Sequence, residues 1–163
     1  MPRARAASTA LRLANESEAV RPGPAWAPLG RALLHHWQKL QAGATSSAPP
    51  LLYWSNLRPG EPETLPPELF FRRPAEMSAL ERRALELCLR QGGRAVDLGA
   101  GVGSHVLALQ QRGLQISGLE LCVDAVEVMK ARGVECQAGS FWNLPAATKY
   151  DTMLMLMNTA GRN

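Results

Sequence analysis

Apolar and polar positions alternate with two different periods over residues 76–163. Helices are predicted over 77–93, 105–112 and 125–132, and strands over 94–98, 114–120, 134–138 and 150–158. Each predicted helix ends at a glycine, which is typical of the C′ position. Strands that alternate with helices in this order predict right-handed crossovers between parallel strands. The pattern therefore predicts an α/β fold built on a doubly wound parallel sheet.

Capping residues support the three predicted helices. Ser78 and Glu81 have the spacing of a capping box. Ser104 is predicted to cap the helix over 105–112, and Asp124 with Glu127 the helix over 125–132. The apolar positions of the first helix are predicted to share one face, which consists of Met77, Leu80, Ala84, Leu87 and Cys88.

Residues 1–75 have a different character, because they hold eleven of the twelve prolines. One amphipathic helix is predicted over 30–43, where an apolar stripe is bounded by glycines. A short strand is predicted over 51–55, and the proline-rich stretch 58–68 is expected to be a loop. Residues 1–29 are predicted to be a disordered tail, with a transit peptide as the alternative.

Composition narrows the class of protein. The 163 residues suit one globular domain, and 46% are hydrophobic. The net charge of +4 comes from residues 1–60, where seven basic residues face two acidic ones, while 61–163 hold eleven against twelve. These basic residues are scattered without interleaved aromatics, so nucleic acid is not an expected partner. No apolar run reaches the roughly 20 residues of a membrane span. Three cysteines without C-x-x-C spacing favour idle thiols in the cytoplasm and no metal site.

The stretch AVDLGAGVGSH, residues 95–105, concentrates three glycines directly after a predicted strand. A glycine costs roughly 0.5–1 kcal/mol relative to alanine inside a regular element, so three of them need a reason. Ligands of parallel sheets bind outside the carboxyl ends of the strands. Gly99, Gly101 and Gly103 are therefore predicted to let the backbone approach a ligand closely.

Two acidic residues indicate which ligand this is. Glu120 ends the next predicted strand, where its carboxylate can accept two hydrogen bonds from a ribose diol. Asp97 precedes the glycines, where it would repel a pyrophosphate and attract an ammonium group. The glycine spacing also departs from the dinucleotide pattern, whose third glycine would fall on Ser104. S-adenosylmethionine fits these features; the alternatives are a turn role for Asp97 and a solvated strand end for Glu120.

The motifs VDLGAGVGSHVLAL, ISGLELCVDAVEVMKARGVE, AGSFWNLP and KYDTMLMLMN resemble those of class I S-adenosylmethionine-dependent methyltransferases, in particular a bacterial branch without assigned substrates. The resemblance covers residues 30–163 and implies a Rossmann-like fold. It implies that the cofactor-binding residues are Asp97, Gly99, Ala100, Gly101, Gly103, Glu120, Leu121, Ser140, Phe141 and Asn158. Asp97 would face the ammonium group, Glu120 the ribose and Leu121 the adenine. The family usually has an acid at Ser140, so adenine recognition is expected to be weaker here.

The resemblance implies methyl transfer from S-adenosylmethionine to an unidentified acceptor, most simply a small molecule. The family's sheet has seven strands in the order 3-2-1-4-5-7-6, so we expect 76–163 to be an incomplete cofactor-binding domain that ends after strand four. Residues 30–75 would form the N-terminal helix and a lid segment. The apolar strand over 150–158 would then have an open edge that favours self-association. The alternatives are a non-catalytic interaction module and a nicotinamide-dependent oxidoreductase.

Three further residues near the motifs have two interpretations each. His105 is either a packing residue in the first turn of a helix or a base. Arg72 and Arg73 either form a solvated pair or reach the cofactor's carboxylate. No catalytic residue is predicted from the sequence.

Overall fold

The computed structural model describes residues 27–44, 48–55, 58–144 and 147–156. A four-stranded sheet forms its centre, with β3 (Arg94–Leu98), β4 (Gln115–Glu120), β5 (Cys136–Ala138) and β6 (Thr152–Leu154). All pairs are parallel and the order is β5-β4-β3-β6. The chain runs from β3 outward to β5 and then returns to the other side of β3. This confirms the predicted fold, and the reversal of strand order beside β3 is where such sheets bind ligands.

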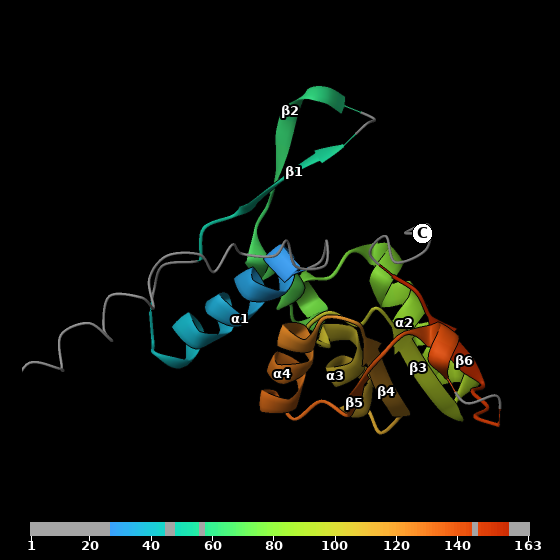
Figure 1. Ribbon diagram of the computed structural model, residues 1–163. Coiled ribbons are helices and arrows are strands. Elements are labelled where there is room, and N and C mark those ends of the chain that lie inside the picture. Colours follow the sequence, from blue (N-terminus) through green and yellow to red (C-terminus); the bar gives the residue numbers. More distant parts are fainter. Residues whose placement is uncertain (1–26, 45–47, 56–57, 145–146, 157–163) are drawn as a thin grey trace, which may run out of the picture.

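Helices α2 (Ala79–Gln91), α3 (Ser104–Gln110) and α4 (Val123–Ala131) pack against one face of this sheet (Figure 1). Alternate strand residues point to opposite faces. Ala95 therefore joins the core under these helices, whereas Val96 and Leu98 pack with Leu144 and Tyr150 on the opposite face. By the same alternation Asp97 lies on the helix-covered face with Ala95. This placement decides which helices can reach the Asp97 carboxyl group.

Helix α1 (Ala27–Gln41) forms a second core by packing against α4 (Figure 1). The two helices approach closely at Gly30, where an added Cβ would lie 2.1 Å from Sγ of Cys122. Leu33 is fully buried at this contact, as its place in the predicted stripe suggests. The predicted helix over 30–43 thus exists, and the described helix also includes residues 27–29 of the predicted disordered tail. Residues 1–26 of that tail lie outside the described residues.

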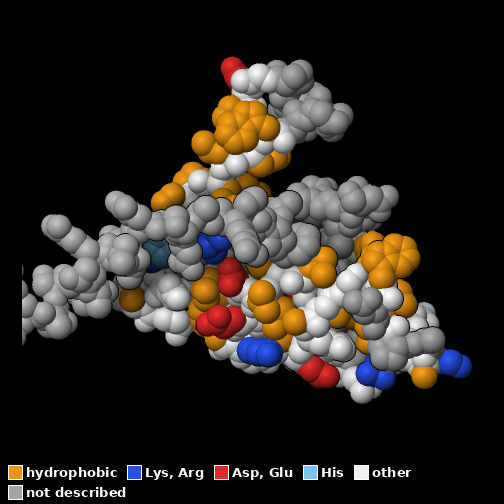
Figure 2. Space-filling view, in the orientation of Figure 1, with side chains coloured by type: hydrophobic (Ala, Val, Ile, Leu, Met, Phe, Trp, Pro, Cys, Tyr) orange, Lys and Arg blue, Asp and Glu red, His pale blue; other side chains and the backbone are white. Residues whose placement is uncertain are grey.

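An antiparallel hairpin projects away from the rest of the molecule (Figure 1). Its strands are β1 (Leu51–Ser55) and β2 (Arg58–Leu65), so the expected loop over 58–68 is largely a strand. Prolines are tolerated here because a two-stranded hairpin leaves an edge on each strand unpaired. Figure 2 shows hydrophobic side chains gathered on this hairpin, and Trp54 is 68% exposed. The short 3-10 helices η1 (Pro67–Phe70) and η2 (Pro74–Glu76) then lead to α2, and η3 (Phe141–Asn143) follows β5.

None of the described helices is long and apolar enough to cross a membrane.

Two details of the helices differ from the sequence predictions. The N-cap residues of α3 and α4 are Gly103 and Cys122, so neither Ser104 nor Asp124 acts as a cap. Ser104 instead donates to the carbonyl of Phe70 at 2.5 Å. Ser104 thus makes a tertiary contact, although the local sequence pattern predicts a capping role for it.

The buried face of α2 also differs. The capping box of Ser78 and Glu81 is present, but Leu80 is 76% exposed and Leu87 is exposed as well. The buried positions are Glu81, Leu85 and Cys88. The buried face of α2 is thus shifted relative to the predicted face and includes Glu81. A pattern of apolar residues does not reveal this, because Glu81 is buried with polar partners.

Gly103 is expected to be sensitive to substitution. Its φ is +77°, and an added Cβ would lie 2.9 Å from Cγ of Met129 and Cγ1 of Val134. Gly103→Ala should lower the unfolding free energy by roughly 2–4 kcal/mol, from backbone strain and overpacking together. Gly113→Ala is the matched control, because Gly113 has φ +83° and open space around it; it should lose only about 1 kcal/mol. Equal losses in urea denaturation would contradict the packing contribution.

Candidate functional site

The glycine loop is anchored to the end of β4 by backbone hydrogen bonds. The N–H groups of Gly99 and Ala100 donate to the carbonyl of Leu119 at 2.8 and 3.2 Å. Gly99 and Gly101 have φ of +70° and +57°, a backbone conformation that other residues rarely adopt. The loop therefore holds a fixed conformation at the carboxyl edge of the sheet.

The Glu120 carboxylate completes this anchoring. Its Oε2 accepts from the N–H of Gly101 at 2.8 Å, and its Oε1 accepts from the N–H of Cys122 at 2.9 Å. Each carboxylate oxygen has a further lone pair for another donor. Glu120 is half-buried, so a ligand can still reach it. Its side chain is thus oriented by the same loop that it supports.

Asp97 is the most deeply buried carboxyl group of the described residues. It is 2% exposed, and its Oδ2 has no hydrogen-bond partner. Burial raises the pKa of Asp97, and nearby His105 opposes this shift. Nδ1 of His105 lies 3.6 Å from Oδ2, which is beyond hydrogen-bond distance but close enough for a strong charge interaction. A buried carboxylate oxygen without a donor is costly unless a ligand supplies one.

A row of alternating charges connects Asp97 to the N-terminal part of the chain. Nε2 of His105 lies 3.0 Å from Oε1 of Glu81. The same oxygen accepts from Nη2 of Arg72 at 2.6 Å, and Oε2 accepts from the N–H of Ser78 at 2.8 Å. Burial alone would lower the pKa of His105, but Asp97 and Glu81 outweigh burial and raise it. The row therefore runs from the Asp97 carboxyl group through the His105 ring and the Glu81 carboxylate to the Arg72 guanidinium.

Glu81 gives this row a pH-dependent contribution to stability. Burial would raise the pKa of Glu81, but hydrogen bonds from Ser78 and His105 and the charge of Arg72 together lower it to about 2. Because this pKa is below that of an unfolded glutamate, about 4.3, the stabilisation present above that value is lost as the pH falls toward 2.

Glu81→Gln should therefore flatten the decline of the melting temperature between about pH 4.5 and 2. Glutamine can keep the capping box, so the helix terminus is preserved. Glu86→Gln, at an exposed ion pair on the same helix, is the control and should leave the acid limb unchanged. Parallel melting curves for the wild type and Glu81→Gln across this range would contradict the assignment.

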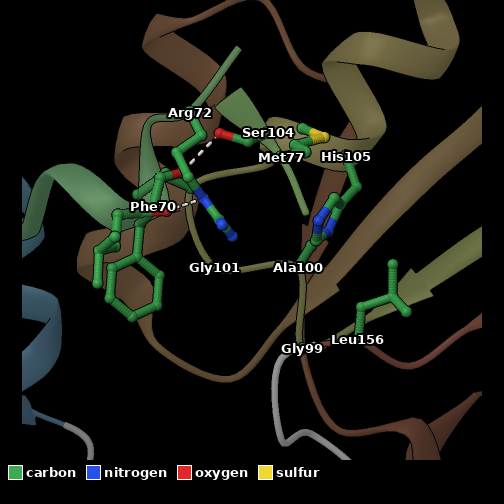
Figure 3. A pocket seen from close by; sticks show the side chains of 11 residues that line it. Phe70, Arg72, Met77, Gly99, Ala100, Gly101, Ser104, His105 and Leu156 are labelled. Carbon is green, nitrogen blue, oxygen red and sulfur yellow. Dashed lines mark hydrogen bonds between the residues drawn. The ribbon is translucent and has the colours of Figure 1, made fainter. Parts of the chain in front are cut away.

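A cleft lies between this charge row and the glycine loop (Figure 3). Its empty volume is about 450 Å³, and this figure includes the part that is open to solvent. The walls are formed by the glycine loop and the start of α3, by Met77 and Leu156, and by three residues before α2, which are Leu69, Phe70 and Arg72. In Figure 3 the side chains of Arg72 and His105 both extend toward the loop. The cleft thus joins the predicted glycines to residues from the N-terminal segment.

Arg132 holds two walls of the cleft together. Its Nη1 donates to the carbonyl of Val102 at 2.6 Å and to Oγ of Ser104 at 3.2 Å. Its guanidinium also lies over the ring of Phe71, 5.2 Å from the centroid. Together with the bond from Ser104 to Phe70, these contacts dock the segment after η1 onto the start of α3.

The remaining predicted site residues lie along the same edge of the sheet. Leu121 is exposed immediately after β4. Ser140 accepts from the N–H of Trp142 at 3.3 Å, and the rings of Phe141 and Trp142 are 4.2 Å apart. They follow β5, so they lie beyond β4 from the glycine loop. Asn158 lies outside the described residues.

Comparison with known proteins assigns a family to this architecture. The chain is 32% identical to a SAM-dependent methyltransferase from Bacteroides fragilis, solved with S-adenosyl-L-homocysteine. The TM-score is 0.69, with 83% of this chain and 52% of that chain covered. The chain belongs to the class I S-adenosylmethionine-dependent methyltransferase family. It spans about half the length of the Bacteroides methyltransferase.

A more distant structure is a SAM-bound amino pentose methyltransferase from Micromonospora echinaspora involved in calicheamicin biosynthesis. It is 20% identical, with a TM-score of 0.47, and 67% of this chain and 44% of that chain are covered. No protein-family model and no curated protein sequence matches the chain. The family assignment rests on the Bacteroides methyltransferase.

Sequence reasoning missed part of this site. Arg72 is not in a solvated pair, since its side chain is 19% exposed and bound to Glu81, whereas Arg73 is exposed and pairs with Glu76. The sequence pattern predicts only a capping role for Glu81, but in the structure Glu81 also binds Arg72 and His105. One signal was available: Glu81, Leu85 and Cys88 follow a helical spacing, which would include an acid on the buried face.

Proposed function

We propose that the chain binds S-adenosylmethionine in the cleft at the carboxyl edge of the sheet and forms the cofactor-binding part of a methyltransferase. The observation that carries the proposal is the unpartnered Oδ2 of Asp97 beside the glycine loop, with the Glu120 carboxylate across the loop. A buried carboxylate suits an ammonium group and repels a phosphate. The identity to a methyltransferase solved with S-adenosyl-L-homocysteine supports the same ligand.

The proposed contacts follow from the chemistry of each side chain. Asp97 would accept from the ammonium group, directly or through water, and Glu120 from the ribose hydroxyls. Gly99, Ala100, Gly101 and Gly103 would pass beneath the cofactor. Leu121, Ser140 and Phe141 would surround the adenine, and Asn158 would open the acceptor side.

When bound, S-adenosylmethionine supplies a methyl group on a sulfonium, and its leaving group is a neutral thioether. The residues of the cleft therefore serve mainly to orient the reactants and exclude water. Met77, Phe70 and Leu69 form an apolar wall suited to this exclusion. A base is required only when the acceptor must lose a proton, and we assign none. We propose a small molecule as the acceptor.

Calorimetric titration of the purified chain with S-adenosylhomocysteine and with NAD tests the cofactor. We expect saturable binding of S-adenosylhomocysteine and no heat with NAD. Binding of NAD alone would overturn the proposal and favour a nicotinamide-dependent oxidoreductase. A methyl-transfer assay with a panel of small amines, alcohols and thiols would then test the acceptor class.

We also propose that β6 mediates self-association. Among the described strands β6 pairs with β3 alone, and Met153 on it is exposed. An unpaired apolar strand edge is a template for pairing with a second copy. Light scattering of the purified chain should show a dimer or a larger species, and a monodisperse monomer would contradict this prediction.

A further inference from the structure

His105 makes two polar contacts in the charge row that packing of its helix does not explain. Its ring lines the cleft and bridges two carboxyl groups on different elements, Asp97 on β3 and Glu81 on α2. The Glu81 side is a normal hydrogen bond of 3.0 Å, while the Asp97 side is a looser 3.6 Å. The ring is therefore fixed by Glu81 and presents Nδ1 to Asp97.

Glu81 is itself held firmly enough to fix this ring. One of its oxygens binds Arg72 and the other binds the N–H of Ser78. Its side chain is 8% exposed, so water does not replace these partners readily. Glu81 is thus a permanent anion on the far side of His105 from Asp97, which favours the charged imidazolium.

We infer that His105 is a positioning residue for cofactor binding: held by Glu81, it keeps a positive charge beside Asp97, so that Asp97 is ionised when the cofactor's ammonium group meets it. This inference rests on the proposed function. A carboxyl group as deeply buried as Asp97 would otherwise hold its proton, and a neutral acid is a poor partner for an ammonium group.

The other groups around the pair are compatible with this role. Cys88 on α2 also interacts with Asp97, and burial raises the pKa of its thiol, so it remains neutral. Arg72 reaches the row from the segment after η1 and is paired with Glu81. Among the described residues, His105 is thus the basic group that lies close enough to Asp97 to interact with its charge.

The test measures binding of S-adenosylhomocysteine by calorimetry from pH 5.5 to 9 for the wild type and His105→Gln. The control ligand is 5′-methylthioadenosine, which has the adenosine but no ammonium group. We expect His105→Gln to bind S-adenosylhomocysteine more than tenfold more weakly at pH 6, because Asp97 then keeps its proton, and to recover at pH 9. Binding of 5′-methylthioadenosine should not change. Equal affinities of the two proteins for S-adenosylhomocysteine at pH 6 would overturn the inference.

A second readout needs no ligand. The carbon-13 signal of the Asp97 carboxyl group should titrate at higher pH in His105→Gln than in the wild type, and an unchanged titration would overturn the inference. If circular dichroism shows that His105→Gln is unfolded, Glu81→Gln replaces it, with a smaller shift expected in the same direction. Absence of all binding to the wild type would overturn the proposed function, whereas normal wild-type binding with an unaffected variant overturns the inference alone.

Discussion

Asp97→Asn should weaken binding of S-adenosylhomocysteine by about ten- to a hundredfold without lowering the melting temperature. The loss corresponds to one charge-assisted hydrogen bond, worth roughly 1.5–3 kcal/mol. Stability should not fall, because the lost charge interaction with His105 is offset by removing the cost of burying a carboxylate that is 2% exposed and whose Oδ2 has no hydrogen-bond donor. An amide at this position avoids the cost of burying a charge. Asp97 would thus contribute to binding at the expense of stability.

Calorimetry and thermal melting of Asp97→Asn measure both effects. Asp151→Asn is a matched control, since Asp151 accepts from the N–H of Arg94 at 2.7 Å, at the amino end of β3. It should lose stability and keep its affinity for S-adenosylhomocysteine. The reverse pattern, with Asp97→Asn less stable and binding normally, would return Asp97 to a purely structural role.

Glu120→Ala should reduce the affinity for S-adenosylhomocysteine by more than tenfold. Two charge-assisted hydrogen bonds to the ribose would be lost, each worth roughly 1.5–3 kcal/mol. The structure adds a second consequence, because the N–H groups of Gly101 and Cys122 lose their acceptor. The unfolding free energy should therefore fall as well, by about 1–3 kcal/mol.

Binding and stability are separated by measuring affinity at a temperature where both proteins are fully folded. Glu120→Ala should weaken binding of 5′-methylthioadenosine as much as that of S-adenosylhomocysteine, since both carry the ribose. Asp97→Asn should weaken only the latter. Glu127→Gln, at an exposed position of α4, is the control with unchanged affinity. Normal binding of both ligands by Glu120→Ala would leave Glu120 with only its contacts to the loop.

The α/β fold class and the place of the glycine loop after a strand followed from the sequence pattern, whereas the order of the strands was an implication of the family resemblance. Hydrophobic periods and glycine stops report local structure, and parallel strands joined by helices have few allowed arrangements. The strands β3, β4 and β5, the glycine loop and Glu120 at the end of β4 therefore appear where the pattern predicted them. Gly103 illustrates why: its positive φ is a local requirement that leaves a direct trace in the sequence.

Contacts between distant segments were decided by the tertiary structure alone. Glu81 has the local signature of a capping residue, and only the packing of α2 against α3 brings it to His105. The sequence favours a solvated Arg72, but docking of its segment on the start of α3 brings Arg72 to Glu81. The prolines of β2 favour a loop, yet this segment forms a strand because pairing with β1 outweighs local propensity. Ion pairs and strand pairings join residues far apart in the chain. Hydrophobic periodicity reports only local structure, so it does not identify such partners.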